Sequence, residues 1–221
     1  MSEFLKKRAR LLREIEHDAR STASFTGRKR LSGAVLTAIG RIPREDYVGE
    51  ADRARAYVNR PLPIGHGQTI SQPFIVALMT ELIDPRPGQT VLEIGTGSGY
   101  QAAVLAELVA HVYSVEVVEE LASRAADRLE AEGVANVTVR HGDGAEGWPE
   151  HAPYDGIVVT AAAREIPPAL VAQLKHGGRM ILPVGPAGSE QMLTLVTKDA
   201  EGRVATEAVL PVAFVPLVPD D

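Results

Sequence analysis

The sequence predicts an α/β protein built on a doubly wound, mostly parallel sheet. From Thr90 onward, short apolar runs alternate with amphipathic segments, as strands and helices do when both faces of a sheet are covered. A glycine-rich turn follows the first of these runs, at the place where such sheets bind ligands. Apolar residues make up 45% of the 221 positions, which is enough to bury the core of one domain.

The individual elements follow from the hydrophobic pattern in chain order. Helices are predicted over 1–20, 31–39 and 74–83, the first with Phe4, Leu5, Leu12 and Ile15 on one face, and a Pro- and Gly-rich loop over 60–73. Strands are predicted at 90–94, 112–116, 137–139, 156–160 and 180–184, and further helices at 100–110, 118–132 and 169–175. The alternating runs 192–198 and 204–217 flank a turn at 199–202 and predict an antiparallel C-terminal hairpin.

We expect a single domain over 1–221, with an N-terminal helical cap at 1–60, a substrate and lid segment at 61–89 and an α/β core at 90–221. The sequence has no cysteine, which excludes disulfides, thiolate metal sites and a cysteine nucleophile. No apolar run approaches the roughly 20 residues of a membrane helix, and no signal peptide is recognisable, so the cytoplasm is the expected location.

Charge is distributed unevenly along the chain. The net charge is −6, yet residues 1–60 carry 14 Lys and Arg against 8 Asp and Glu. We interpret this excess as the solvated face of N-terminal helices, with attraction of acidic polypeptides as the alternative. Because no aromatic residues interleave with the basic cluster, nucleic acid is not an expected partner.

The glycine loop after the strand 90–94 is the strongest local signal. Gly95, Gly97 and Gly99 give the spacing G-x-G-x-G, whereas dinucleotide sites have G-x-G-x-x-G. Glu93 directly precedes the loop. Its carboxylate would repel a pyrophosphate, but would attract the ammonium and sulfonium groups of S-adenosyl-L-methionine. The loop therefore favours S-adenosyl-L-methionine over NAD.

Two further acids suit a nucleoside cofactor. Glu116 ends the second predicted strand, where an acid can accept hydrogen bonds from a ribose diol. Asp143 and Gly144 follow the third strand, in a position that suits an acceptor for the adenine amine. A simple turn is the alternative for Asp143.

Several collinear segments resemble a single family. They are IPREDYV at 42–48, PLPIGHGQTISQP at 61–73, GTGSGYQAAVLA at 95–106, GDG at 142–144, YDGIVVTAAA at 154–163 and FVPL at 214–217. Their order and spacing resemble those of the protein-L-isoaspartate (D-aspartate) O-methyltransferases over roughly residues 30–218. The resemblance implies a Rossmann-like, S-adenosylmethionine-dependent fold. It also implies methyl transfer to the carboxylate of L-isoaspartyl or D-aspartyl residues in damaged proteins, with repair through a succinimide.

The resemblance assigns Ser71 as the active-site residue and implies isoaspartyl-containing proteins and peptides as partners. The cofactor contacts that we expect are Thr69, Ile70, Glu93, Gly95, Thr96, Gly97, Ser98, Glu116, Asp143 and Gly144. The substrate contacts that we expect are Ile64, Gln72, Thr160 and Gln191. No metal and no membrane are expected, and we expect a monomer.

A carboxylate acceptor needs no general base, because carboxylic acids with a pKa near 4 are ionised at pH 7. We therefore expect Ser71 to orient the acceptor or the cofactor, with a helix N-cap as the alternative role. His66, between two glycines, is interpreted as a loop histidine, and Trp148 as a packing residue.

Two positions depart from the family pattern. Asn59 stands where an acid is expected, and Ala213 precedes FVPL where arginine is common. Both bear on substrate choice more than on cofactor choice. The alternatives are a methyltransferase for another carboxylate, a non-catalytic adaptor that binds S-adenosylmethionine, and a nicotinamide dehydrogenase.

Overall fold

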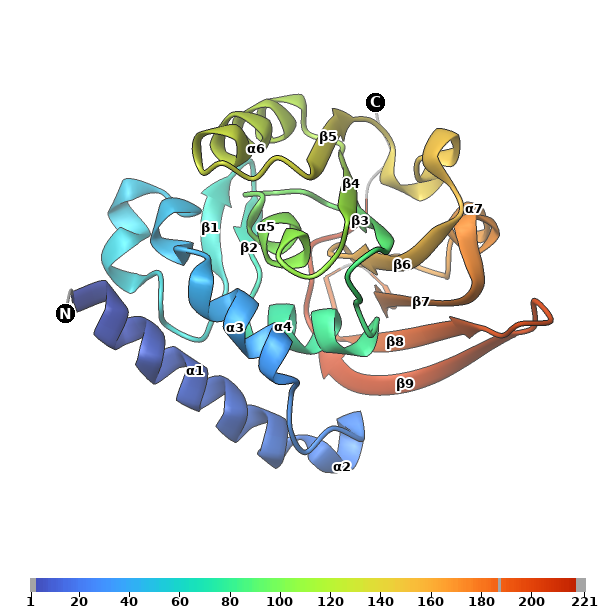
Figure 1. Ribbon diagram of the computed structural model, residues 1–221, viewed down its shortest axis with the longest axis horizontal. Helices are drawn as coiled ribbons and strands as arrows, with labels where there is room; N and C mark the ends of the chain where they lie inside the picture. Colours follow the sequence, from blue (N-terminus) through green and yellow to red (C-terminus); the bar gives the residue numbers. More distant parts are fainter. Residues whose placement is uncertain (1–2, 187, 218–221) are drawn as a thin grey trace.

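A seven-stranded sheet in the order β5-β4-β3-β6-β7-β8-β9 forms the centre of the protein (Figure 1). In this computed structural model, residues 3–186 and 188–217 are described. The first five strands in that order are parallel, and β8 is antiparallel to both of its neighbours. The strands are β3 (Thr90–Ile94), β4 (His111–Glu116), β5 (Val137–His141), β6 (Tyr154–Val159), β7 (Leu174–Val184), β8 (Gln191–Lys198) and β9 (Val204–Val212). The predicted doubly wound sheet with an antiparallel C-terminal pair is confirmed.

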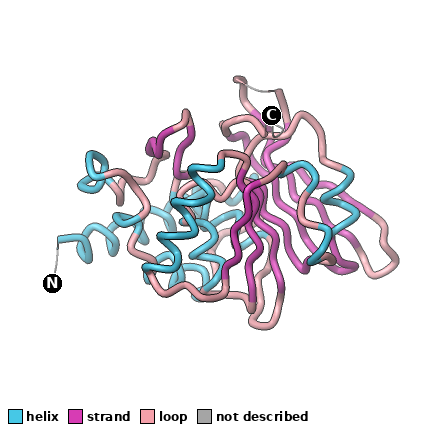
Figure 2. Tube along the Cα trace, turned by 90° about the horizontal axis from the view of Figure 1, so that it is seen from above, coloured by secondary structure: helices cyan, strands magenta, loops and turns pink. Residues whose placement is uncertain are grey.

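Helices cover both faces of the sheet, as the view from above shows (Figure 2). Alternate strand residues point to opposite faces, so Val91 joins one buried cluster while Leu92 and Ile94 join the other. The larger cluster lies under α1 (Glu3–Ser21), α3 (Gly33–Arg41), α4 (Pro73–Leu82), α5 (Tyr100–Ala106) and α6 (Glu119–Ala131). The smaller cluster lies under α7 (Pro168–Gln173) and the short helices η3 (Gly144–Glu146) and η4 (Pro149–His151).

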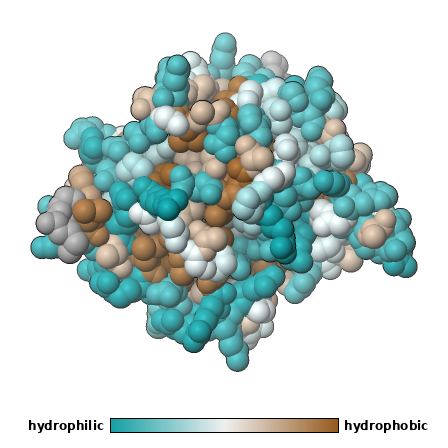
Figure 3. Space-filling model, in the orientation of Figure 1, coloured by the Kyte–Doolittle hydropathy of each residue, from teal (hydrophilic) through white to brown (hydrophobic). Residues whose placement is uncertain are grey.

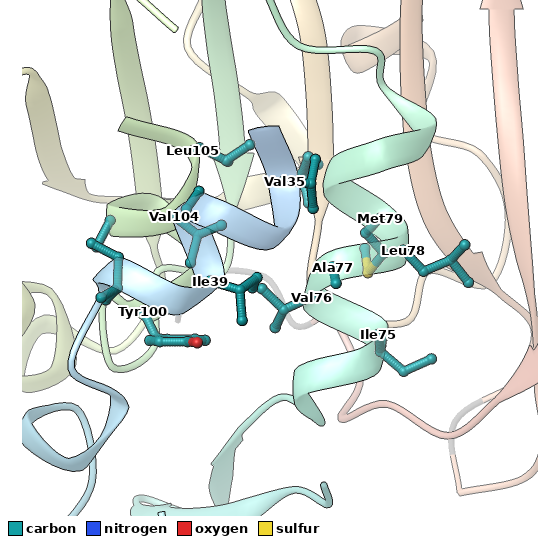
Figure 4. Packing of buried hydrophobic residues seen from close by; sticks show 14 of the residues in the cluster. Val35, Ile39, Ile75, Val76, Ala77, Leu78, Met79, Tyr100, Val104 and Leu105 are labelled. Carbon is teal, nitrogen blue, oxygen red and sulfur yellow. The ribbon is translucent and has the colours of Figure 1, made fainter. Parts of the chain in front are cut away.

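Helix α4 lies at the centre of the larger cluster. All of its residues except Glu81 are buried. Side chains of α3, such as Val35 and Ile39, lie between those of α4 and those of α5 (Figure 4). A helix that is apolar on every side is stable only when protein surrounds it. This burial fixes the N-terminus of α4, close after Ser71 in the chain, relative to the sheet.

The N-terminal helix buries a stripe that overlaps the predicted face. Leu11, Ile15 and Ala19 are its buried residues, whereas Leu5 is 47% exposed. Phe4 and Leu12 are half-buried and pack against the larger cluster, so the predicted face is wrong only at Leu5. The cap is completed by α2 (Ala23–Thr26), η1 (Arg44–Asp46) and η2 (Glu50–Arg55).

The segment predicted as a loop over 60–73 is largely a hairpin, with strands β1 (Leu62–Gly65) and β2 (Gln68–Ile70). Gly65, His66 and Gly67 all have positive φ angles of 96°, 53° and 71°, which reverse the chain within three residues. Prolines and glycines masked the strand signal here. His66 lies at the turn, and its Nε2 is 3.2 Å from Glu120 Oε2 on α6.

Three other predicted elements were too long. Helix α5 ends at Ala106 rather than 110, and α7 ends at Gln173, where β7 begins. The last strand ends at Val212 instead of 217, because the chain then leaves the sheet edge. It crosses back so that Leu217 N donates to Ala162 O at 2.8 Å.

Hydrophilic side chains cover most of the face in Figure 3, with hydrophobic ones gathered near its centre. Among the helices of the described ranges, none is long and apolar enough to cross a membrane.

Candidate active site

Two cavities meet at the carboxyl ends of the central strands. The first, here called the loop cavity, is lined by the glycine loop, by Glu116 and by Gly144, with Thr69 above and the segment 215–217 beside it. The second, here called the open cavity, has a volume of about 440 Å³ and is lined by Ser71, Gln72, Glu190 and the segment 211–215 among others. Thr69 and Thr160 line both cavities, so they form the boundary between them.

The glycine loop adopts a conformation that requires glycine. Gly95 has φ 90°, and a Cβ there would overlap with Thr160 Oγ1. Thr160 Oγ1 donates to Gly95 O at 2.6 Å, which holds the loop against β6. A Cβ on Gly144 would likewise overlap with Ile94 Cγ2. Both glycines line the loop cavity, and their contacts with a cofactor stay predictions.

Glu116 is the acid that lines the loop cavity. The residue is 5% exposed, and its carboxylate accepts hydrogen bonds from Gly97 N at 2.8 Å and Val118 N at 3.0 Å. These bonds fix both carboxylate oxygens next to the loop. Each oxygen keeps a lone pair with which it could accept from a ribose hydroxyl.

Glu93 lies beneath the loop and lines neither cavity. It is fully buried; Ser114 Oγ donates to its Oε2, and Thr96 Oγ1 lies 2.5 Å from Ser114 Oγ. Burial raises the pKa of Glu93 to about 8, so the carboxyl is mostly protonated at neutral pH. The structure thus corrects the expectation that a charged Glu93 carboxylate attracts the cationic groups of the cofactor. Glu93 supports the loop through Ser114 and Thr96, and its direct contact with a cofactor stays a prediction.

The raised pKa of Glu93 predicts a pH dependence of stability. The folded state holds a proton that an exposed glutamate, with an ordinary pKa of 4.5, releases. The contribution is complete below pH 4.5 and is lost as pH rises through about 8. In Glu93→Gln this titration is absent. Between pH 6 and pH 8 the free energy of unfolding of the parent should fall by about 2 kcal/mol more than that of the variant, as urea denaturation would measure. Equal falls in both proteins would contradict the assignment.

Asp143 occupies the position of a helix cap. Its Oδ1 accepts from Ala145 N at 2.8 Å, and the side chain is half-buried beside Gly144. The turn that was the alternative is therefore present. The predicted contact with adenine stays a prediction.

Ser71 lines the open cavity and reaches the edge of the glycine loop. It lines the open cavity and also a small recess of about 20 Å³ that it shares with Ile70, Thr96, Ser98 and Gln101. The N-cap of α4 is Gln72, not Ser71, and Pro73 is the first helical residue. The N-cap alternative for Ser71 is therefore wrong, and its hydroxyl can serve the cavities.

The other predicted substrate residues lie in different places. Gln72 and Thr160 line the open cavity. Ile64 lines neither named cavity, because it packs under the hairpin, where its Cδ1 is 3.3 Å from the place of a Cβ on Gly97. Gln191 is 2% exposed, and its side-chain amide makes hydrogen bonds to the backbone. Its Nε2 donates to Ser189 O at 2.7 Å, and its Oε1 accepts from Phe214 N at 2.8 Å. Contacts of Ile64 and Gln191 with substrate stay predictions.

The two departures from the family pattern also have places. Ala213 lines the open cavity. Among the described residues that line this cavity, Glu190 is the one with a charged side chain. Asn59 lies outside the cavity but bonds to the backbone of α4, since Phe74 N donates to its Oδ1 at 3.0 Å. Trp148, as predicted, is a packing residue at 9% exposure.

Sequence reasoning missed Gln101. The residue is 6% exposed and lines the recess, and its Nε2 donates to Thr80 Oγ1 at 2.9 Å. Its Oε1 has no hydrogen-bond partner within the described ranges. A buried acceptor without a partner beside a glycine loop suits a cationic ligand group. The one signal in the sequence was a polar residue on the apolar helix 100–106.

Comparisons with known proteins show the family to which the chain belongs. Residues 26–221 match the family model described as Protein-L-isoaspartate(D-aspartate) O-methyltransferase. The chain is 60% identical over 210 residues to protein-L-isoaspartate O-methyltransferase 2 of Syntrophobacter fumaroxidans, covering 95% of this chain and 85% of that protein. It is 56% identical over 207 residues to protein-L-isoaspartate O-methyltransferase 2 of a Polaromonas species, covering 94% and 98%.

Solved structures show the same likeness. A protein-L-isoaspartate O-methyltransferase superposes with a TM-score of 0.84 at 30% identity, covering 96% of this chain and 66% of that chain. A structure from Plasmodium falciparum that contains S-adenosyl-L-homocysteine shares the fold, with a TM-score of 0.73 at 22% identity over 93% of this chain and 97% of that one.

The sheet order, the glycine loop and the acid at the end of β4 define an S-adenosylmethionine-dependent methyltransferase. Because the family model covers residues 26–221, the chain belongs to the protein-L-isoaspartate (D-aspartate) O-methyltransferase family.

Proposed function

We propose that this protein transfers a methyl group from S-adenosyl-L-methionine to the free carboxylate of L-isoaspartyl or D-aspartyl residues in damaged proteins. The observation that carries the proposal is the shared wall of the two cavities. Thr69 and Thr160 line both cavities, and Ser71 lines the open cavity together with the recess that these two threonines also line. A methyl donor in the loop cavity and a carboxylate in the open cavity would therefore be neighbours.

The residues present fit the cofactor. Glu116 faces the loop cavity with both carboxylate oxygens fixed by backbone donors, which suits a ribose diol. The unpartnered Oε1 of Gln101 on the recess, in the described part of the chain, suits an ammonium group. When bound, S-adenosyl-L-methionine supplies an electrophilic methyl group on a sulfonium.

The open cavity suits an acceptor that is already ionised. Its wall in the described part of the chain carries hydroxyl groups from Thr69, Ser71 and Thr160, and neither histidine nor lysine. A carboxylate with an ordinary pKa needs no proton removed before it reacts. The Ser71 hydroxyl can donate to one carboxylate oxygen and leave the other free to attack, so orientation is its proposed task.

We further propose that the β1–β2 hairpin, the first part of the segment 61–89, covers the bound cofactor, whereas α4 in the same segment belongs to the buried core. Gln68 and Thr69 of β2 line the loop cavity, and the contact between His66 and Glu120 ties the hairpin turn to α6. We also propose that the protein is a cytoplasmic monomer that needs neither nucleic acid nor membrane.

The proposal is tested with two synthetic peptides that differ only in an isoaspartyl or an aspartyl residue. Incubation with radiolabelled S-adenosyl-L-methionine should label the isoaspartyl peptide, as a base-labile ester that releases methanol. Labelling of another peptide carboxylate would point to a different substrate. Cofactor binding with no transfer to either peptide would indicate the adaptor.

A further inference from the structure

We infer that Asn59 is a positioning residue for the active site and that Asp18 on the N-terminal helix fixes its orientation. Asn59 lies between η2 and β1, outside both cavities. Its amide joins two distant parts of the chain. Nδ2 donates to Asp18 Oδ2 at 2.8 Å, and Oδ1 accepts from Phe74 N at 3.0 Å.

The bond to Phe74 replaces a missing helix cap. Helix α4 begins with Pro73, which has no N–H, and its N-cap residue Gln72 makes no side-chain cap bond. The Phe74 N–H is therefore an early helical donor that needs a partner from elsewhere. Since Phe74 is 4% exposed, water is a poor substitute, and Asn59 provides the acceptor.

This bond joins two chain segments that both contribute to the wall of the open cavity. Ser71 and Gln72 precede Phe74 by three and two residues, and both line the cavity. Pro61, two residues after Asn59, lines the same cavity. The Asn59 amide thus fixes the separation of two chain segments between which the substrate carboxylate would bind.

Asp18 determines which way the amide faces. Phe74 N is a donor and the Asp18 carboxylate is an acceptor, so a single orientation of an asparagine amide satisfies both. An aspartate at position 59 could still accept from Phe74 N, but it would place two carboxylates in contact. This explains why asparagine stands at position 59 in a chain that has Asp18, where the family pattern leads us to expect an acid.

The inference predicts that activity is lost when position 59 alone is changed and is regained when the side chains at positions 18 and 59 are exchanged. In Asn59→Asp, repulsion from Asp18 should displace the start of α4 and lower kcat/KM on the isoaspartyl peptide about tenfold. The affinity for S-adenosyl-L-homocysteine should change less than threefold. Adding Asp18→Asn should restore kcat/KM to within threefold of the parent. The new amide at position 18 can then donate to the new carboxylate at position 59, which still accepts from Phe74 N. The single variant Asp18→Asn completes the double-mutant cycle.

The matched control is Asn136→Asp. Asn136 Nδ2 donates to Ala106 O at 3.0 Å and Val109 O at 3.2 Å, so this asparagine joins loops at the far end of α5. Its replacement should lower the melting temperature and leave kcat/KM unchanged. All kinetics are measured at a temperature where circular dichroism shows each variant folded. If Asn59→Asp does not fold, Asn59→Ala takes its place with the same expected loss, and the double variant is compared directly with the parent.

The result that overturns the inference is parental kcat/KM in folded Asn59→Asp, or no recovery in the double variant. The inference rests on the proposed function for its assay. The parent enzyme separates the two: an inactive parent refutes the proposed function, whereas an active parent with unaltered variants refutes only the role of Asn59.

Discussion

Replacing Gly95 with alanine is expected to weaken binding of S-adenosyl-L-homocysteine by at least about a hundredfold. The new Cβ would overlap with Thr160 Oγ1, and the φ of 90° is strained for any residue with a side chain. Either the glycine loop or Thr160 must move, and both line the loop cavity. A loss of roughly 3 kcal/mol in binding corresponds to this factor. Isothermal titration calorimetry measures it directly.

Gly133→Ala is the matched control for backbone strain. Gly133 has φ 72°, but a Cβ there meets nothing within 4 Å, and the residue lies at the end of α6 away from both cavities. Its variant should lose some thermal stability and bind the ligand as the parent does. If folded Gly95→Ala bound as tightly as Gly133→Ala, the loop would not be the cofactor site.

Replacing Ser71 with alanine is expected to lower kcat on an isoaspartyl peptide by roughly 10- to 100-fold. A hydrogen bond to a charged acceptor contributes about 1.5–3 kcal/mol, and each 1.36 kcal/mol corresponds to a factor of about ten in rate. Ser71 lines the open cavity and the recess, but not the loop cavity. Affinity for S-adenosyl-L-homocysteine should therefore stay within threefold of the parent.

Ser189→Ala provides the comparison for Ser71. The Ser189 hydroxyl donates to Pro186 O at 3.3 Å, the residue is exposed, and it lies outside both cavities. Its removal should leave kcat unchanged. Full turnover in Ser71→Ala would remove the hydroxyl from the mechanism, and a parallel loss of ligand affinity would reassign it to the cofactor.

The sequence by itself determined the sheet, the loop and the family. Apolar strands separated by helical periods leave few arrangements other than a covered parallel sheet, so β3, β4 and the antiparallel pair β8–β9 were predicted close to most of their observed bounds. Gly95 and Glu116 were also predictable. The ends of parallel strands meet at one edge of the sheet, so residues there converge whatever the details of packing.

Tertiary structure decided what depends on contacts between distant segments. The charge state of Glu93 follows from complete burial beside Ser114, and neither the glycine spacing nor its neighbours in sequence reveal it. The hairpin at 62–70 packs over the glycine loop, with Ile64 near Gly97, although its composition is that of a loop. The cap of α4 is supplied by Asn59 and not by Ser71 because Pro73 has no N–H and the chain brings a remote amide to Phe74. Burial and long-range hydrogen bonds depend on how the whole chain packs, so local sequence patterns do not predict them for a single residue.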